Sequence, residues 1–272
     1  MFVTVLMAVV FSQTPSWSAA VTVEQSRESL RYRFDTPSSF NTDFLVPHFF
    51  EQRYDTSNTW IGLRVGHLLL GKRAESRVST TPSATRRADD FDTFNQPDGN
   101  VIVSGTTGTA SLRSWKVDER VALARIRGAE SGIALTFRHD AAAFNEGTGI
   151  VTTSTPATET RTLVTTREFT TSRMIEIAAF ASVTRSSLSI DARIVPAAAG
   201  RLAVRLPDKY PGRELVFTAR YALASAEIRL LRRIGGVRTG AALRAETTRP
   251  WHRTAAVYRR SLTLMLEVGS GS

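Results

Sequence analysis

The chain has 272 residues, no cysteine and a formal net charge of +10 at pH 7. The absence of cysteine excludes disulfide frameworks, thiolate metal sites and cysteine nucleophiles. The length fits one large domain, because no stretch has the composition of a long linker. Arginine carries almost all of the positive charge and is scattered along the chain instead of clustering with aromatic residues, which argues against a nucleic-acid partner.

Residues 1–20 have the layout of a signal peptide, which leaves 21–272 as the mature domain. An apolar run from Phe2 to Phe11 precedes a more polar stretch that ends in small residues, with Ser18 and Ala20 at the two small positions before cleavage. No later segment offers the roughly twenty mostly apolar residues that a membrane-spanning helix needs. If the mature chain spans a membrane, it must therefore do so as a β-barrel.

Apolar and polar residues alternate with period two along the mature region, and this pattern predicts β-strands. In chain order the predicted strands span 28–36, 59–70, 74–82, 110–126, 132–143, 159–183, 186–206, 214–232, 237–247 and 255–268. Almost every strand has a charge on its second face. In the strand 110–126, Glu119 falls on the same face as Trp115 and Val121, which indicates either a bulge there or an incorrect strand assignment.

We assign the apolar face of each strand to the outside and the charged face to the inside. In the strand 28–36 the outward set is Leu30, Tyr32 and Phe34, and in the strand 214–232 it is Leu215, Phe217, Ala219, Tyr221 and Leu223.

Connections of different length alternate along the chain. Short ones lie near 71–73, 127–131, 184–185 and 234–236, and longer polar ones at 37–58, 83–109 and 145–158, with shorter tips at 207–213 and 248–253. Short turns at one end, long loops at the other and an even number of strands are typical of outer-membrane barrels.

With these features the chain resembles bacterial outer-membrane β-barrel proteins, which also carry aromatic residues near strand ends, here Tyr32, Trp60, Trp115, Tyr221 and Tyr258. The resemblance implies an all-β fold, an antiparallel transmembrane up-and-down β-barrel of about ten strands (range roughly 8–12). It also implies a monomer exported to the outer membrane of a diderm bacterium, with outer-membrane lipids, lipopolysaccharide and the barrel-insertion machinery as partners. One departure is the last strand, which ends Leu266-Glu267-Val268 where such barrels commonly end on an aromatic residue.

The charged face predicts the side chains that line the lumen, namely Arg31, Arg33, Arg64, Arg138, Glu176, Asp191, Arg193, Arg205, Arg220, Arg259 and Glu267. Because a barrel of about ten strands has a small interior, we expect these groups to brace one another and water. The alternative is a narrow pore that prefers anions.

Three arginines of the strand 159–183 share the outward parity of Ile175 and lie on its loop-side half, namely Arg161, Arg167 and Arg173. At that height they could pair with lipopolysaccharide phosphates. The alternative is a strand extension standing in solvent.

The omptins, outer-membrane proteases of similar size and strand number, use an Asp pair facing an Asp/His pair. This chain has Asp90 and Asp92 in a long loop and His139 beside Asp140, the residue types that acid-base hydrolysis needs. The later tip 207–212 lacks the histidine of the omptin pattern, so no catalytic residue is assigned. His48, His67 and His252 lack metal-ligand spacing, and neither a metal nor a cofactor is predicted.

The leading hypothesis is a non-enzymatic outer-membrane barrel with extracellular loops, serving envelope structure, surface interaction or limited solute passage. One alternative is a barrel enzyme, either an omptin-like protease or a lipid-modifying hydrolase. Another is a secreted, soluble β-sandwich that acts as a binding module.

Overall fold

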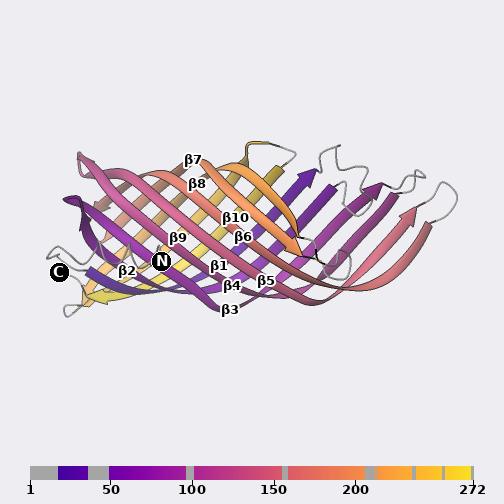
Figure 1. Cartoon of the computed structure of the whole chain (residues 1–272). Helices are drawn as coiled ribbons and strands as arrows, with labels where there is room; N and C mark the ends of the chain where they lie inside the picture. The colour runs from indigo at the N-terminus through magenta and orange to yellow at the C-terminus, as the bar shows by residue number, and fades with distance from the viewer. Residues whose placement is uncertain are drawn as a thin grey trace.

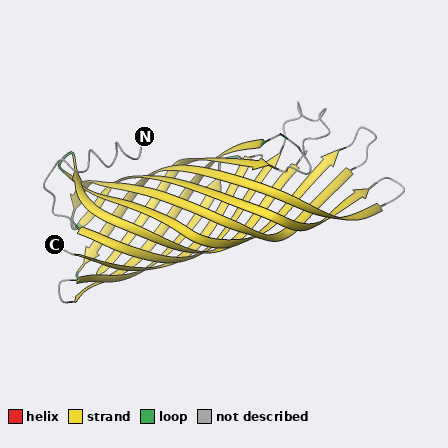
Figure 2. Ribbon diagram, turned by 60° about the horizontal axis from the view of Figure 1, so that its bottom comes forward, coloured by secondary structure: helices red, strands yellow, loops and turns green. Residues whose placement is uncertain are grey.

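The computed structural model describes residues 18–35, 49–95, 101–154, 159–205, 212, 214–234, 237–252 and 255–270. These residues form one all-β structure, a closed barrel of antiparallel strands that tilt around a common axis (Figures 1 and 2). No helix within these residues is long and apolar enough to cross a membrane. The predicted fold class is confirmed, and the two-sheet sandwich is wrong because a single sheet closes on itself.

The barrel has ten strands, as predicted. They are β1 (Ser18–Asp35), β2 (Phe49–Leu69), β3 (Lys72–Asn95), β4 (Val101–Ile126), β5 (Ala129–Ser154), β6 (Glu159–Arg185), β7 (Leu188–Arg205), β8 (Leu215–Ile234), β9 (Val237–Pro250) and β10 (Ala255–Ser270). Each strand pairs with its neighbour in sequence, and β1 closes the barrel against β10. Most of the predicted signal, 1–17, lies outside the described residues, and β1 begins at Ser18.

The short connections gather at one end of the barrel, here called the turn end (Figure 1). Ser18 and Ser270 lie there too, because Ser18 pairs with Gly66 of β2 and Ser270 with Val237 of β9. Two of these turns place a non-glycine residue and then a glycine at positive φ, Leu70-Gly71 and Arg127-Gly128. Positive φ at both central residues gives the tight hairpin turn whose twist matches the flanking strands. The remaining connections lie at the opposite end, the loop end.

Several strands run much further toward the loop end than predicted. The predicted loops 83–109 and 145–158 are mostly strand, because β3 continues to Asn95, β4 begins at Val101 and β5 continues to Ser154. These segments are rich in Thr and Val, which favour the pleated sheet. Strands β4, β5 and β6 have 26, 26 and 27 residues, whereas crossing a bilayer takes about 9–11. The β5–β6 hairpin therefore projects well beyond a membrane-sized segment (Figure 1).

The outer wall of the turn-end half is apolar. Its exposed side chains include Val21, Val23, Ile61, Leu63, Ile133, Leu135, Ile175, Ile177, Ile190, Ile194, Ile228, Leu230, Leu243, Leu262, Leu264, Leu266 and Val268. Large hydrophobic side chains on all ten strands, including Val78 of β3 and Leu123 of β4, make a band of the kind that faces acyl chains.

The interior of the loop-end half is also apolar. Leu30, Tyr32, Leu112, Met174, Leu202, Tyr221 and Val257 form a buried cluster, which we call the apolar plug. Leu30 and Tyr221 are 0 % exposed. The plug fills the lumen on the loop side of the charged residues described below.

Strand β7 changes the face that it presents to the lumen halfway along its length. Val195 pairs with Leu223 and Ala198 with Tyr221, so β7 holds one residue more than β8 over this step. Pro196 lies in this bulge, where its missing N–H is tolerated. Odd-numbered residues face inward before the bulge and even-numbered ones after it, which turns Leu202 into the plug and Arg205 outward.

Candidate functional site

Inward-facing charges of the turn-end half make a network that spans the lumen. Arg138 of β5 reaches Glu28 of β1 across the barrel, and its two terminal nitrogens each donate to one Glu28 oxygen at 2.7 Å. Its Nε also donates to Asp140 at 3.0 Å. All three side chains are buried. Two parallel charge-assisted hydrogen bonds fix the geometry of this pair and link strands that are not neighbours.

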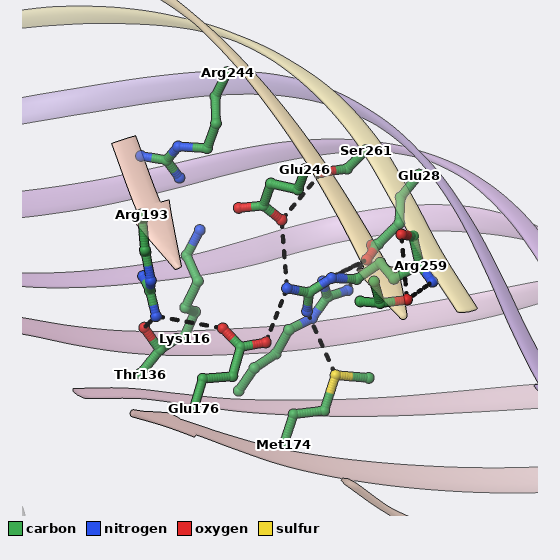
Figure 3. A network of polar contacts seen from close by, with 12 residues as sticks. Glu28, Lys116, Thr136, Met174, Glu176, Arg193, Arg244, Glu246, Arg259 and Ser261 are labelled. Carbon is green, nitrogen blue, oxygen red and sulfur yellow. Dashed lines mark hydrogen bonds and ion pairs between the residues drawn. The ribbon is translucent and has the colours of Figure 1, made fainter. Parts of the chain in front are cut away.

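A second cross-barrel group joins β10 to β6 (Figure 3). Arg259 donates to Glu176 at 2.9 Å and lies 3.4 Å from Glu246. The hydroxyl of Tyr221 donates to the same Glu176 at 3.1 Å, and the Arg259 guanidinium touches the sulfur of Met174 at 3.5 Å. Because Tyr221 and Met174 belong to the apolar plug, these contacts join the plug to the charged layer.

Arg193 of β7 lies at the centre of the charged network. It donates to Asp118 at 3.0 Å and to Thr136 at 2.6 Å, and it lies 3.4 Å from Glu176. Thr136 in turn donates to Asp118. One guanidinium thus bridges three other strands, β4, β5 and β6.

Further ion pairs continue the layer toward the turn end. Arg64 donates to Glu267 at 3.0 Å, and Arg120 donates to Asp191 at 2.6 Å. Glu227 accepts from Arg229 at 2.6 Å and from Arg244 at 2.7 Å. A pair between Arg77 and Glu24 adds another link.

The network leaves little open space. Its central cavity, bordered by Arg77, Lys116 and Arg193 among others, measures about 40 Å³, room for about one water. A larger cavity of about 440 Å³ opens at the turn end between Arg64, Arg120 and Arg229. Since the arginines named in the network lie against inward carboxylates, the interior does not favour anions over cations.

The structure places seven of the predicted lumen residues on the inward face, namely Arg64, Arg138, Glu176, Asp191, Arg193, Arg259 and Glu267, and all seven take part in the network. The prediction is wrong for Arg31, Arg33, Arg205 and Arg220, which lie on the outward face. On β1 and β8 the alternating apolar residues, among them Leu30, Tyr32 and Tyr221, enter the plug, so their arginine neighbours point out. Arg205 is turned outward by the bulge in β7.

Several network residues were not predicted. Glu24 and Arg244 are examples; Glu24 lies in the part of β1 that precedes the predicted first strand. The alternation of Val21 and Val23 with Thr22 and Glu24 carried the signal, but it begins at the predicted cleavage site, where strand residues were not expected.

Of the three arginines predicted to meet lipopolysaccharide, Arg173 is exposed on the outward face. Its register partner on β7 is another exposed arginine, Arg201. Arg161 and Arg167 lie in β6, but their side chains are outside the described part of the chain.

Of the residues considered for hydrolysis, the described His139 and Asp140 lie on opposite faces of the barrel wall. His139 and Asp140 are consecutive in β5 and therefore point to opposite faces: His139 lies outside near Trp115, with ring centroids 5.8 Å apart, and Asp140 is buried inside. Asp90 and Asp92 lie in β3, and their side chains are not among those described. Within the described residues no three His, Asp or Glu side chains are grouped as metal ligands.

Glu119 lies on the outward face of β4, where the register with β3 runs unbroken from Ala74–Val121 to Thr81–Ser114. The irregularity in the predicted strand 110–126 comes just after it, where Ala122 and Ala124 of β4 pair with the consecutive residues Gly132 and Ser131 of β5. Its carboxylate accepts a hydrogen bond from Ser76 and lies 3.2 Å from Nε2 of His67. The imidazole is buried even though it belongs to the outer wall. A compact polar cluster thus interrupts the apolar band.

No family model matches the chain, and no curated protein matches it. Among solved structures it is similar to the outer membrane protease OmpT from Escherichia coli, with 7 % identity over 96 % of this chain and 99 % of that chain and a TM-score of 0.62. It also aligns with the translocator domain of the autotransporter NalP from Neisseria meningitidis, at 8 % identity over 99 % and 93 % of the two chains with a TM-score of 0.30. The chain has the fold of a bacterial outer-membrane β-barrel, and at this identity the likeness extends to the fold alone.

Proposed function

We propose that this chain spans the outer membrane of a diderm bacterium as a monomeric, non-enzymatic and non-conducting barrel that carries long β-hairpins beyond the bilayer for surface interaction. Export through the N-terminal signal and delivery by the barrel-insertion machinery would bring it there. The filled lumen is the observation that carries the proposal. Among the described residues an ion-paired layer and an apolar plug lie in series, which supports a closed lumen.

The outer wall supports the membrane-spanning part of the proposal. The apolar band covers the turn-end half, while the loop-end half exposes arginines on its outer face, including Arg173, Arg201, Arg205, Arg220 and Arg260, which we call the loop-side belt. Arg173 and Arg201 oppose each other across a strand pair and repel; Glu214, 3.9 Å from Arg201, is one counterion, and a second counterion would neutralise the pair. Phosphates of lipopolysaccharide would supply that counterion.

Single-channel recording in planar bilayers tests the proposal. We expect no conductance steps from the wild-type barrel. A variant that combines Tyr32→Ala, Tyr221→Ala and Leu202→Ala shortens the plug and also removes the hydrogen bond from Tyr221 that holds Glu176 in the charged layer, so both barriers are weakened and the barrel should leak. A gel shift between boiled and unboiled samples checks that this variant is folded. Steady steps from the wild-type protein would contradict the closed lumen. A folded but silent plug variant would show that the plug is not what seals the barrel.

A further inference from the structure

The turn end carries an unusual excess of positive charge. The four short turns and their flanks, residues 68–73, 123–130, 183–189 and 230–239, contain eight lysines and arginines but a single acid, Glu130. Six of these cations are described and exposed, namely Lys72, Arg73, Arg125, Arg127, Arg185 and Arg232, which we call the turn ring. Glu130 pairs with Arg73 at 3.2 Å, so the one acid offsets only one of these cations.

Large apolar side chains accompany these cations at the tips of three turns. Leu70 is 92 % exposed, Ile126 65 % and Ile234 58 %. Each lies within two residues of a member of the turn ring along the chain. Exposed hydrophobic groups next to cations are the composition of surfaces that sit at the boundary between headgroups and acyl chains.

We propose that the turn ring binds the phosphates of anionic phospholipids in the leaflet opposite the loops. This inference rests on the proposed membrane-spanning function, because the ring reaches that leaflet only if the apolar band crosses the bilayer. The ring lies at the edge of the band, since the outward Leu123, Val183 and Leu230 directly precede or adjoin the turns. Long arginine side chains at that height can extend to the headgroups while Leu70, Ile126 and Ile234 enter the acyl region.

Charge and composition favour a lipid surface over a periplasmic polymer or protein. Each exposed cation near an anionic surface strengthens binding by roughly fivefold, and the ring has members on all four turns, so the attraction acts around the whole circumference of the barrel. A soluble acidic partner would meet the cations but would leave the three apolar tips in water. Only a bilayer provides phosphates beside hydrocarbon.

The test compares lipid retention by two variants that lose the same charge. The first carries Arg125→Gln, Arg127→Asn, Arg185→Gln and Arg232→Gln; asparagine at 127 tolerates the positive φ of that position. The control carries Arg173→Gln, Arg201→Gln, Arg205→Gln and Arg220→Gln in the loop-side belt. Each protein is reconstituted in nanodiscs of equal phosphatidylglycerol and phosphatidylcholine, extracted in mild detergent, and assayed by mass spectrometry for phospholipid that remains bound.

We expect the wild type and the control to retain more phosphatidylglycerol than phosphatidylcholine. In the turn-ring variant the ratio of the two retained lipids should fall by about tenfold or more. Equal retention by all three proteins, or a loss confined to the control, would overturn the proposal. Reconstitution in pure phosphatidylcholine, scored by the gel shift between boiled and unboiled samples, distinguishes failure of the turn-ring proposal from failure of the membrane-spanning function. A protein that folds there but shows no phosphatidylglycerol preference contradicts only the turn ring, whereas a protein that does not enter any bilayer contradicts the membrane-spanning function.

Discussion

At the scale of single residues, the lumen is governed by charges that are buried in pairs. Removing two charges from water is unfavourable, and their mutual attraction offsets this only with close contact and further hydrogen bonds. Arg138 and Glu28 meet this condition through two hydrogen bonds of 2.7 Å. Removing one partner should therefore harm the barrel far more than removing an exposed charge.

We predict that Arg138→Ala lowers the free energy of unfolding by about 3–5 kcal/mol, because Glu28 and Asp140 remain buried without their common cation. Denaturant unfolding of the protein in phosphatidylcholine vesicles measures this change. The matched control is Arg173→Ala, an exposed arginine on the neighbouring strand, which should change stability by less than about 0.5 kcal/mol. Equal effects of the two substitutions would show that the cross-barrel pair is not a structural brace.

The outward cluster around Glu119 leads to a second prediction. His67→Leu leaves the carboxylate beside acyl chains without its imidazole partner and should lower the free energy of unfolding by about 1–3 kcal/mol. Adding Glu119→Leu to this variant removes the polar group altogether and should restore stability to the wild-type value or above it. The same vesicle unfolding assay applies. A double variant less stable than the single one would mean that Glu119 faces protein or water and not lipid.

At the scale of strands, the alternation predicted where strands lie better than which face is inside. In the turn-end half the apolar residues point out and the charges point in, as on β10 with Leu264 and Glu267. In the loop-end half this polarity is reversed, because the lumen holds the apolar plug and the outer wall has left the apolar band. A period of two is the same in both halves, so the pattern alone could not distinguish Leu30, which faces in, from Ile61, which faces out.

The bulge in β7 tests how strictly a strand must keep its face. Deleting Ala197 removes the extra residue between Val195 and Ala198 and restores strict alternation. Leu202 and Val204 then stay in the plug and Arg205 stays outside, whereas deletion of Gly200, beyond the bulge, turns Leu202 and Val204 out and Arg205 into the lumen. We predict that the Ala197 deletion preserves the heat-modifiable folded form and that the Gly200 deletion abolishes it. A folded Gly200 deletion would show that the plug does not depend on the face that β7 presents.

At the scale of the whole molecule, closure of the barrel and the position of turns and loops could be predicted, because both follow from local alternation and from the lengths of connections. The lengths of the loops could not be predicted from the sequence, because β3 to β6 continue as paired strands through polar sequence that has no apolar face to mark them. The charged network was predicted only in part, because Glu24 and its partner Arg77 belong to segments whose strands were missed or weakly patterned.

The central claim is a membrane-spanning barrel with a closed lumen, and the natural absence of cysteine allows it to be measured directly. Single cysteines placed in turn from 261 to 266 on β10 can carry a nitroxide label in reconstituted vesicles. We predict that labels at the outward Leu262, Leu264 and Leu266 collide with dissolved oxygen, while those at Ser261, Thr263 and Met265 are shielded from both oxygen and a water-soluble nickel complex. Nickel access at the odd-numbered positions would reveal an aqueous lumen, and loss of the alternation in oxygen access would contradict the barrel in the bilayer.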